Sequence, residues 1–237
     1  MKGTSLTDAF KSYSEAPFAF IWSTFLYLFM NLVAVFAAFG LYFVFFFLGV
    51  AIGMGGVFTI PSYIGIFFAF VFYIYLVMGT KAARIKAYDN ALQGNKVSVV
   101  LFFDFMKKTA MKMMIAQGIR FLLLAIFVLP AIALHIFLLS NVPYVYLLIG
   151  AYILGIGFLI HFVTAPSMVM LSVKVNRVRD ALKATPKFLT KSGIRFMMVY
   201  LLHGVSTVLS VVPLVNLFSI FLLDPVIQSA MINMVSE

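Results

Sequence analysis

Long uncharged runs alternate with short charged segments along the chain. Residues 16–80 and 121–173 contain no Asp, Glu, Lys or Arg, and residues 196–236 contain a single one, Asp224. A transmembrane helix needs about 20 predominantly apolar residues, so each run is long enough to cross a bilayer twice. The pattern therefore predicts six transmembrane helices, with the last two, residues 194–212 and 216–235, shorter than the others.

Each apolar run has one break. A glycine-rich stretch at residues 49–61 divides the first, residues 140–143 (SNVP) divide the second, and a tight turn at residues 213–215 (PLV) divides the third. The first span, residues 18–48, would be about 46 Å long at 1.5 Å per residue, against a hydrocarbon core of about 30 Å. We expect it to tilt, kink or protrude from the membrane.

A short charged motif precedes each apolar run and suggests an internal repeat. Asp8, Asp104 and Asp180 are each followed three residues later by Lys, at Lys11, Lys107 and Lys183. We interpret residues 1–94, 97–173 and 174–237 as three copies of one unit within a single membrane domain, 1–237. The predicted fold is all-α and integral to the membrane, with six transmembrane helices as three hairpin repeats. An interfacial amphipathic helix precedes each hairpin. The second helix of each hairpin contains a helix-breaking residue, at Gly79, Pro166 and Pro225.

The composition supports a membrane environment. Hydrophobic residues make up 64% of the chain and charged residues 10%, whereas soluble domains have about 25% charged residues. The chain has no cysteine, which excludes disulfides, thiolate metal sites and cysteine nucleophiles. Charged residues at 8, 11 and 15 lie where a signal peptide would need an apolar core, so we expect the first span to be retained.

The basic residues predict the orientation. All 17 Lys and Arg lie before the first span, between the second and third, or between the fourth and fifth. The positive-inside rule places these segments, and therefore both termini, in the cytoplasm of a multi-pass protein of the cytoplasmic membrane. The net charge of +10 is interleaved with apolar spans instead of being gathered on a soluble surface, so we expect no nucleic-acid partner.

The same basic segments predict contact with anionic lipid headgroups on the cytoplasmic side, because juxtamembrane Lys and Arg are attracted to them. The alternative is that these charges serve only topology and anchoring. The expected headgroup contacts are Lys81, Arg84, Lys86, Arg177, Arg179 and Lys183.

Ionisable side chains within apolar spans are costly and are functional candidates. The candidate intramembrane polar site consists of Asp224, His203, His161, Arg195 and Arg120. A lipid-facing carboxylate would cost a few kcal/mol, so we expect Asp224 to face the bundle interior, with His203 or Arg195 as its partner. The histidines lack the spacing of metal ligands, and we predict no metal or cofactor.

Two stretches resemble prokaryotic polytopic membrane families of unknown function, including the membrane domain attached to some glycerophosphoryl diester phosphodiesterases. They are AYDNALQGNKVS at residues 87–98, and APSMVM at 165–170 followed by RDALK at 179–183. The resemblance implies a six-span helical domain with interfacial helices between hairpins. It implies no catalytic residues, because the phosphodiesterase chemistry belongs to a separate soluble domain.

Paired carboxylates and the G-x-S-x-G, H-E-x-x-H and phosphate-loop motifs are absent from the sequence, so we predict no enzymatic activity. Three hypotheses remain, of which an intramembrane enzyme is the last and the other two are functions without catalysis. One is a small-solute transporter or channel, which we favour from the sequence. The other is a scaffold or accessory subunit that binds lipids or other membrane proteins, either as a homo-oligomer or in a complex. A conduit needs a continuous polar path, whereas a scaffold has a dry centre and an exposed small-residue or aromatic groove.

Overall fold

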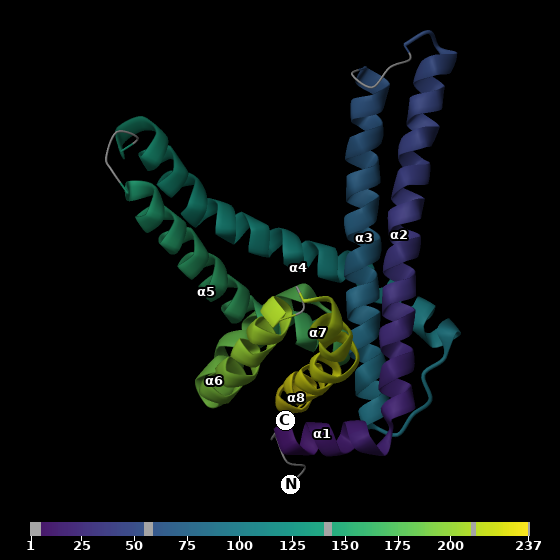
Figure 1. Ribbon diagram of the computed structural model, residues 1–237, viewed down its shortest axis with the longest axis vertical. Helices are drawn as coiled ribbons and strands as arrows, with labels where there is room; N and C mark the ends of the chain where they lie inside the picture. The colour runs from purple at the N-terminus through teal and green to yellow at the C-terminus, as the bar shows by residue number, and fades with distance from the viewer. Residues whose placement is uncertain (1–5, 55–58, 140–143, 210–211, 237) are drawn as a thin grey trace.

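In a computed structural model, residues 6–54, 59–139, 144–209 and 212–236 are described, and all regular structure among them is helical (Figure 1). The elements are α1 (Leu6–Glu15), α2 (Pro17–Ala51), α3 (Ile60–Leu92), α4 (Val99–Leu134), η1 (His135–Leu139), α5 (Val145–Val173), α6 (Val178–Leu209), α7 (Pro213–Phe218), η2 (Ser219–Leu223) and α8 (Asp224–Ser236). The two η elements are π-helical turns that continue α4 and α7.

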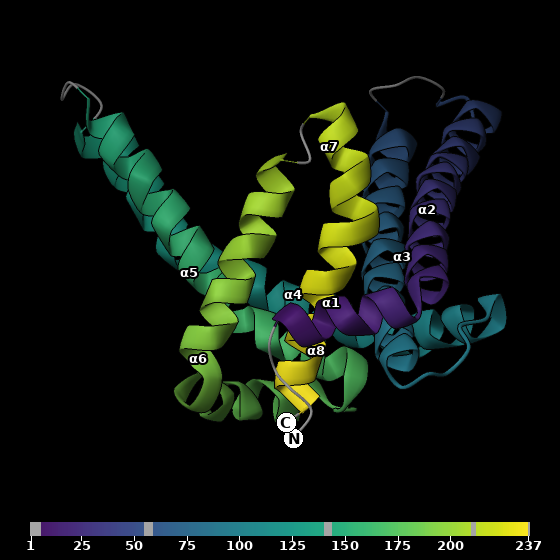
Figure 2. The same cartoon turned by 60° about the horizontal axis from the view of Figure 1, so that its bottom comes forward.

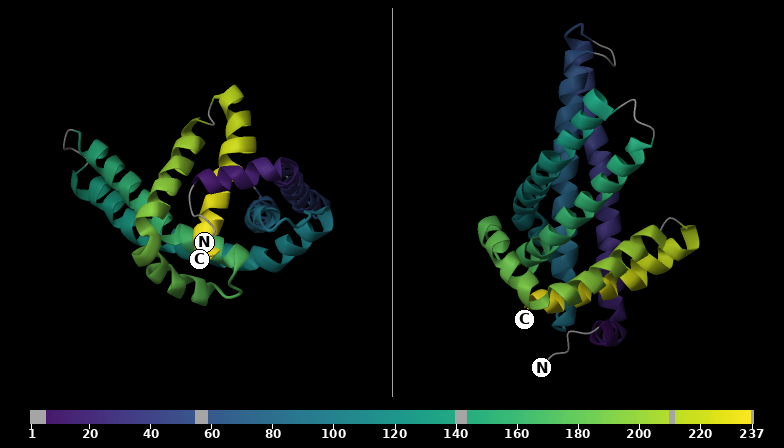
Figure 3. Two further views of the ribbon diagram at one scale, coloured as in Figure 1. Left: turned by 90° about the horizontal axis from the view of Figure 1, so that it is seen from below. Right: turned by 90° about the vertical axis from the view of Figure 1, so that its left-hand side faces the viewer.

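Three helical hairpins meet at one end and diverge toward the other. They are α2 with α3, α4 with α5, and α6 with the continuous α7–η2–α8 (Figures 1 and 2). Helix α1 lies across the return helix of the third hairpin, against α8, as the view from below shows (Figure 3). The buried core lies where the hairpins meet and includes Phe20, Tyr88, Phe196 and Ile232. We call this end the base.

Five helical segments are long and apolar enough to cross a membrane: Pro17–Ala51, Ile60–Leu92, Val99–Phe137, Val145–Val173 and Val215–Ser236. They make the chain a polytopic membrane protein. Helix α6 is not among them, because its first half is rich in basic residues. Its described part beyond Arg195 ends at Leu209 and is about 20 Å long, shorter than the hydrocarbon core. A sixth span in α6 stays a prediction.

Several predicted boundaries differ from the observed ones. The charged motifs at Asp104 and Asp180 lie inside α4 and α6 instead of in separate interfacial helices, and only the first motif has its own helix, α1. Pro213 begins α7 instead of forming a turn, because proline at the first helical position gives up an N–H that would be unpaired there anyway. The break expected at 140–143, and part of the one at 49–61, lie outside the described residues.

The three predicted breakers have different roles. Helix α3 runs through Gly79, where an added Cβ would lie 2.8 Å from Met106 Cγ and 2.9 Å from Ala110 Cβ. This glycine therefore lets α4 cross close against α3. Pro166 lies within an uninterrupted α5, whereas Pro225 is the second residue of α8, which follows the π-helical turn η2.

Helix α1 supplies a hydrogen-bond donor close to Pro225, which has no backbone N–H. In an α-helix the carbonyl of Phe221 would accept a hydrogen bond from the N–H of residue 225, which proline does not have. The Tyr13 hydroxyl donates to this Phe221 oxygen at 2.8 Å instead. Burial raises the pKa of Tyr13, so the hydroxyl keeps its proton and remains a donor at neutral pH.

We expect Tyr13→Phe to lower the free energy of unfolding by about 1–2 kcal/mol, because a partly buried carbonyl loses its donor. Equilibrium unfolding in mixed micelles measures this. The same substitution in a Pro225→Ala background should cost less, because residue 225 then supplies an N–H. Tyr146→Phe, at an exposed ring, is the control. Equal losses in the two backgrounds would contradict the compensation.

Candidate functional site

A buried ion pair joins the first and third hairpins at the base. Arg84 on α3 donates from Nη1 to Oδ2 of Asp224, the first residue of α8, at 2.6 Å. The two side chains are only 9% and 13% exposed. Charge-assisted bonds of this length are among the stronger hydrogen bonds in proteins, and low exposure limits screening by water and salt.

Aromatic rings surround the Arg84 guanidinium. Its Cζ lies 4.0 Å from the centroid of the Tyr27 ring and 6.0 Å from that of Tyr88. The Tyr88 hydroxyl is 2.7 Å from the Thr24 hydroxyl, so the ring is held between α2 and α3. Rings facing a cation stabilise it electrostatically, more so when it is desolvated. Arg84 is therefore fixed in a pocket of α2, α3 and α8.

Asp224 also has a neighbour on α6, the other helix of the third hairpin. His203 on α6 places Nδ1 3.4 Å from Oδ1 of Asp224. His203 was one of the two partners expected from the sequence. The other, Arg195, is exposed, and no ion pair joins it to the described residues. The partner that sequence reasoning missed is Arg84, which it assigned to lipid headgroups.

The second hairpin contributes Arg120 and His161. Arg120 on α4 is 7% exposed and donates from Nε to the Thr164 hydroxyl on α5 at 2.7 Å, and from Nη1 to Gln117 Oε1 at 3.1 Å. His161 lies one turn before Thr164, and its ring centroid is 5.3 Å from that of Tyr200 on α6. These contacts join α4, α5 and α6.

Lys81, one turn before Arg84 on α3, lies within electrostatic range of Arg84, Arg120 and Asp224. We call Lys81, Arg84, Arg120, Asp224, His161 and His203 the charge cluster. Its members come from α3, α4, α5, α6 and α8, so all three hairpins contribute. With neutral histidines, the cluster has three positive charges and one negative charge.

The other predicted headgroup residues lie nearer the surface. Arg177, Arg179 and Lys183 are exposed around the start of α6. Lys86 lines a cavity of about 370 Å³ between α3, α4 and the end of α5, together with Lys108, Lys112 and Lys174. We call this the lysine cavity. The sequence signal for it was the spacing of Lys108 and Lys112, which places both on one face of α4.

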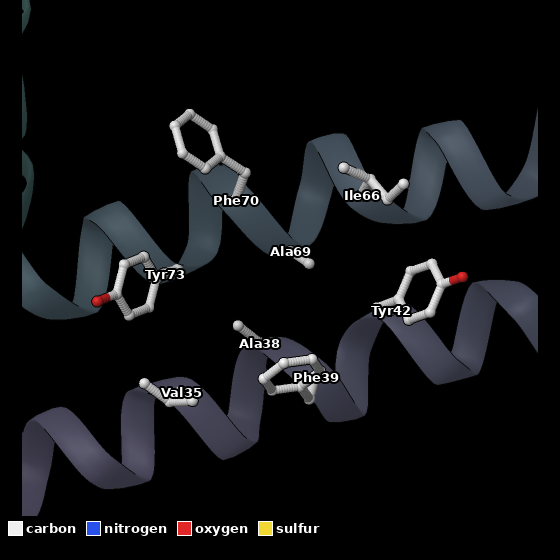
Figure 4. Close-up of a pocket in the computed structure, with 8 residues that line it drawn as sticks. All are labelled: Val35, Ala38, Phe39, Tyr42, Ile66, Ala69, Phe70 and Tyr73. Carbon is white, nitrogen blue, oxygen red and sulfur yellow. The ribbon is translucent and has the colours of Figure 1, made fainter.

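A second cavity, of about 410 Å³, lies between α2 and α3 on the side away from the base (Figure 4). Each helix contributes four lining residues to this cavity: Val35, Ala38, Phe39 and Tyr42 from α2, and Ile66, Ala69, Phe70 and Tyr73 from α3. Ala38 and Ala69 leave room that the surrounding rings do not fill. This groove is aromatic and apolar.

No family model, curated protein or solved structure matches the chain. The resemblance to the membrane domain of glycerophosphoryl diester phosphodiesterases stays a prediction.

Proposed function

We propose that this protein is a non-catalytic membrane scaffold that binds anionic phospholipid at its basic end. The lysine cavity carries the proposal. Four lysines line it, and no acidic residue is among the described residues that line it. Phe105, Leu171 and Val175 supply apolar walls beside these charges. A phospholipid has this combination of an anionic headgroup and an apolar body.

The lysines of the cavity are only partly neutralised. Lys86 bonds Asp89 at 2.6 Å and Lys108 bonds Asp104 at 2.7 Å, the latter pair being exposed. Lys174 donates to the Ser236 carbonyl at 3.5 Å, and Lys112 has no hydrogen bond or ion pair within the described chain. The carbonyl end of α5 attracts these cations, since a helix C-terminus is partially negative. Two full positive charges nevertheless remain for an anion.

The distribution of polar groups favours a scaffold over a transporter or channel. A conduit requires polar residues along a continuous path, as in transporters with a midplane site. Here the polar side chains gather at the base, beside core residues such as Phe196 and Ile232. Toward the other end the first hairpin presents an aromatic groove with small residues (Figure 4). Such a groove suits acyl chains or another apolar helix.

Retention of lipid tests the proposal. We expect Lys112→Gln with Lys174→Gln to reduce retained phosphatidylglycerol several-fold in native mass spectrometry, while retention of phosphatidylcholine stays the same. The difference should shrink at high salt, because screening weakens the attraction in the wild type. The control is Lys96→Gln with Lys107→Gln, which removes the same charge from exposed positions outside the cavity. Equal retention in both double variants would contradict a specific site.

We propose further that the base faces the cytoplasm, because it has the basic residues. A single cysteine at Asn216, near the opposite end of the third hairpin, should react with an impermeant thiol reagent in intact cells. A cysteine at Thr190, exposed on α6, should react only after the membrane is opened. The natural absence of cysteine makes both signals unambiguous. Labelling of position 190 from outside would reverse the orientation.

A further inference from the structure

We propose that the charge cluster holds an anion between Lys81 and Arg120, at a site separate from the lysine cavity. The chemical class is a phosphate, supplied either by a lipid headgroup or as free inorganic phosphate. The site goes beyond the proposed lipid binding at the lysine cavity, because none of its three residues, Lys81, Arg120 and His161, lines that cavity.

Arg120 has unmet capacity for an anion. It is more than nine-tenths buried, and its two hydrogen bonds go to a hydroxyl and an amide, both uncharged. No carboxylate pairs with it within the described chain. A guanidinium has five N–H donors arranged as a fork that matches the oxygens of phosphate. Arg120 therefore presents a positive charge and spare donors.

The one carboxylate of the cluster is already committed. Asp224 contacts Arg84 through Oδ2 and His203 through Oδ1. Elsewhere at the base, both carboxylate oxygens of Asp89 already accept hydrogen bonds, one from Lys86 and one from Gln93. Lys81 makes no hydrogen bond or ion pair with a described residue. Lys81 and Arg120 are thus two cations that form no ion pair with a described residue, in electrostatic range of each other.

His161 adds a third polar group to the same place. Its Nδ1 is buried and has no hydrogen-bond partner among the described residues. It is in electrostatic range of both Arg120 and Lys81. Buried polar atoms are normally paired, and unpaired buried charges are strongly unfavourable. An anion among Lys81, Arg120 and His161 satisfies all three groups at once.

Lys81→Gln and Arg120→Lys test the site, the second keeping the charge but losing the fork. The protein is first given the Lys112→Gln and Lys174→Gln changes, so that failure of the lysine cavity does not affect the result. In one arm, native mass spectrometry counts phosphatidylglycerol retained from vesicles of phosphatidylglycerol and phosphatidylcholine. In the other, the melting temperature of delipidated protein is compared in sodium phosphate and in sodium chloride of equal ionic strength.

We expect one retained anionic lipid, or a phosphate-dependent rise of several degrees in melting temperature, to survive the cavity changes. The first result identifies a headgroup and the second free phosphate. With Lys81→Gln, and with Arg120→Lys, lipid affinity should fall at least tenfold or the phosphate-dependent rise in melting temperature should vanish. Lys96→Gln should leave either signal intact. The proposal is overturned if neither signal exists after the cavity changes, or if Lys81→Gln leaves both signals unchanged.

Discussion

Asp224→Asn should lower the free energy of unfolding by about 3–5 kcal/mol, because it leaves the Arg84 guanidinium buried without its counter-charge. The amide keeps the size of the side chain and can accept a hydrogen bond, so the loss reports the charge. The ion pair is 2.6 Å long and both side chains are almost fully buried. Equilibrium unfolding in mixed micelles, followed by circular dichroism, measures the change.

Asp104→Asn is the matched control. Its ion pair with Lys108 is just as short, 2.7 Å, but the side chains are 46% and 68% exposed. Exposed pairs contribute about 0.2–1 kcal/mol, so this variant should be nearly as stable as the wild type. Replacing both Arg84 and Asp224 with apolar residues should cost less than Asp224→Asn alone. A loss at Asp224 no larger than that at Asp104 would contradict a structural ion pair.

Gly79→Val should destabilise the protein by about 2–3 kcal/mol, because overpacking forces side chains and backbone apart. Even the first added carbon would lie 2.8 Å from Met106 Cγ, 2.9 Å from Ala110 Cβ and 3.1 Å from the Met106 carbonyl. A methionine end can move, but a neighbouring Cβ and a backbone oxygen move only with α4. The expected result is separation of the first and second hairpins at the base.

Gly118→Val separates this effect from the general consequences of replacing a helical glycine. An added Cβ at Gly118 has nothing within 4 Å, so its effect should stay within about 1 kcal/mol. Unfolding free energies of the two variants, measured side by side, decide the matter. Similar losses at both positions would show that helix propensity, and not the approach of α4, explains the glycine.

Together the two junctions explain why the hairpins meet at one end only. The ion pair of Arg84 with Asp224 ties α3 to α8, and Gly79 admits α4 against the same helix within a few turns. Beyond that level, aromatic side chains such as Phe39 and Phe70 are exposed on α2 and α3. In a bilayer, apolar surface toward acyl chains carries no penalty, so the hairpins need not close on each other.

The sequence was sufficient for the class of the fold. Only helices and closed barrels satisfy every backbone group in lipid, and continuous apolar runs of this length are typical of spanning helices, because barrel strands are short. The cost of a carboxylate in lipid was enough to predict that Asp224 points inward. Depth along the spans gave His203 and Arg195 as alternative partners, and the structure places His203 beside Asp224. Both arguments use only local composition and distance along a helix.

The tertiary structure decided which helix faces meet. Arg84 follows an apolar span, a position that fits a headgroup contact as well as an interior one, and its role depends on α8 approaching that face of α3. Gly79 likewise fits a helix break until Met106 and Ala110 are placed against it. Pro225 predicted a free carbonyl, but not that Tyr13, more than 200 residues earlier, would bond it. Hydropathy measures transfer into lipid one residue at a time, whereas these contacts join residues far apart in sequence and depend on the rotation and crossing of whole helices.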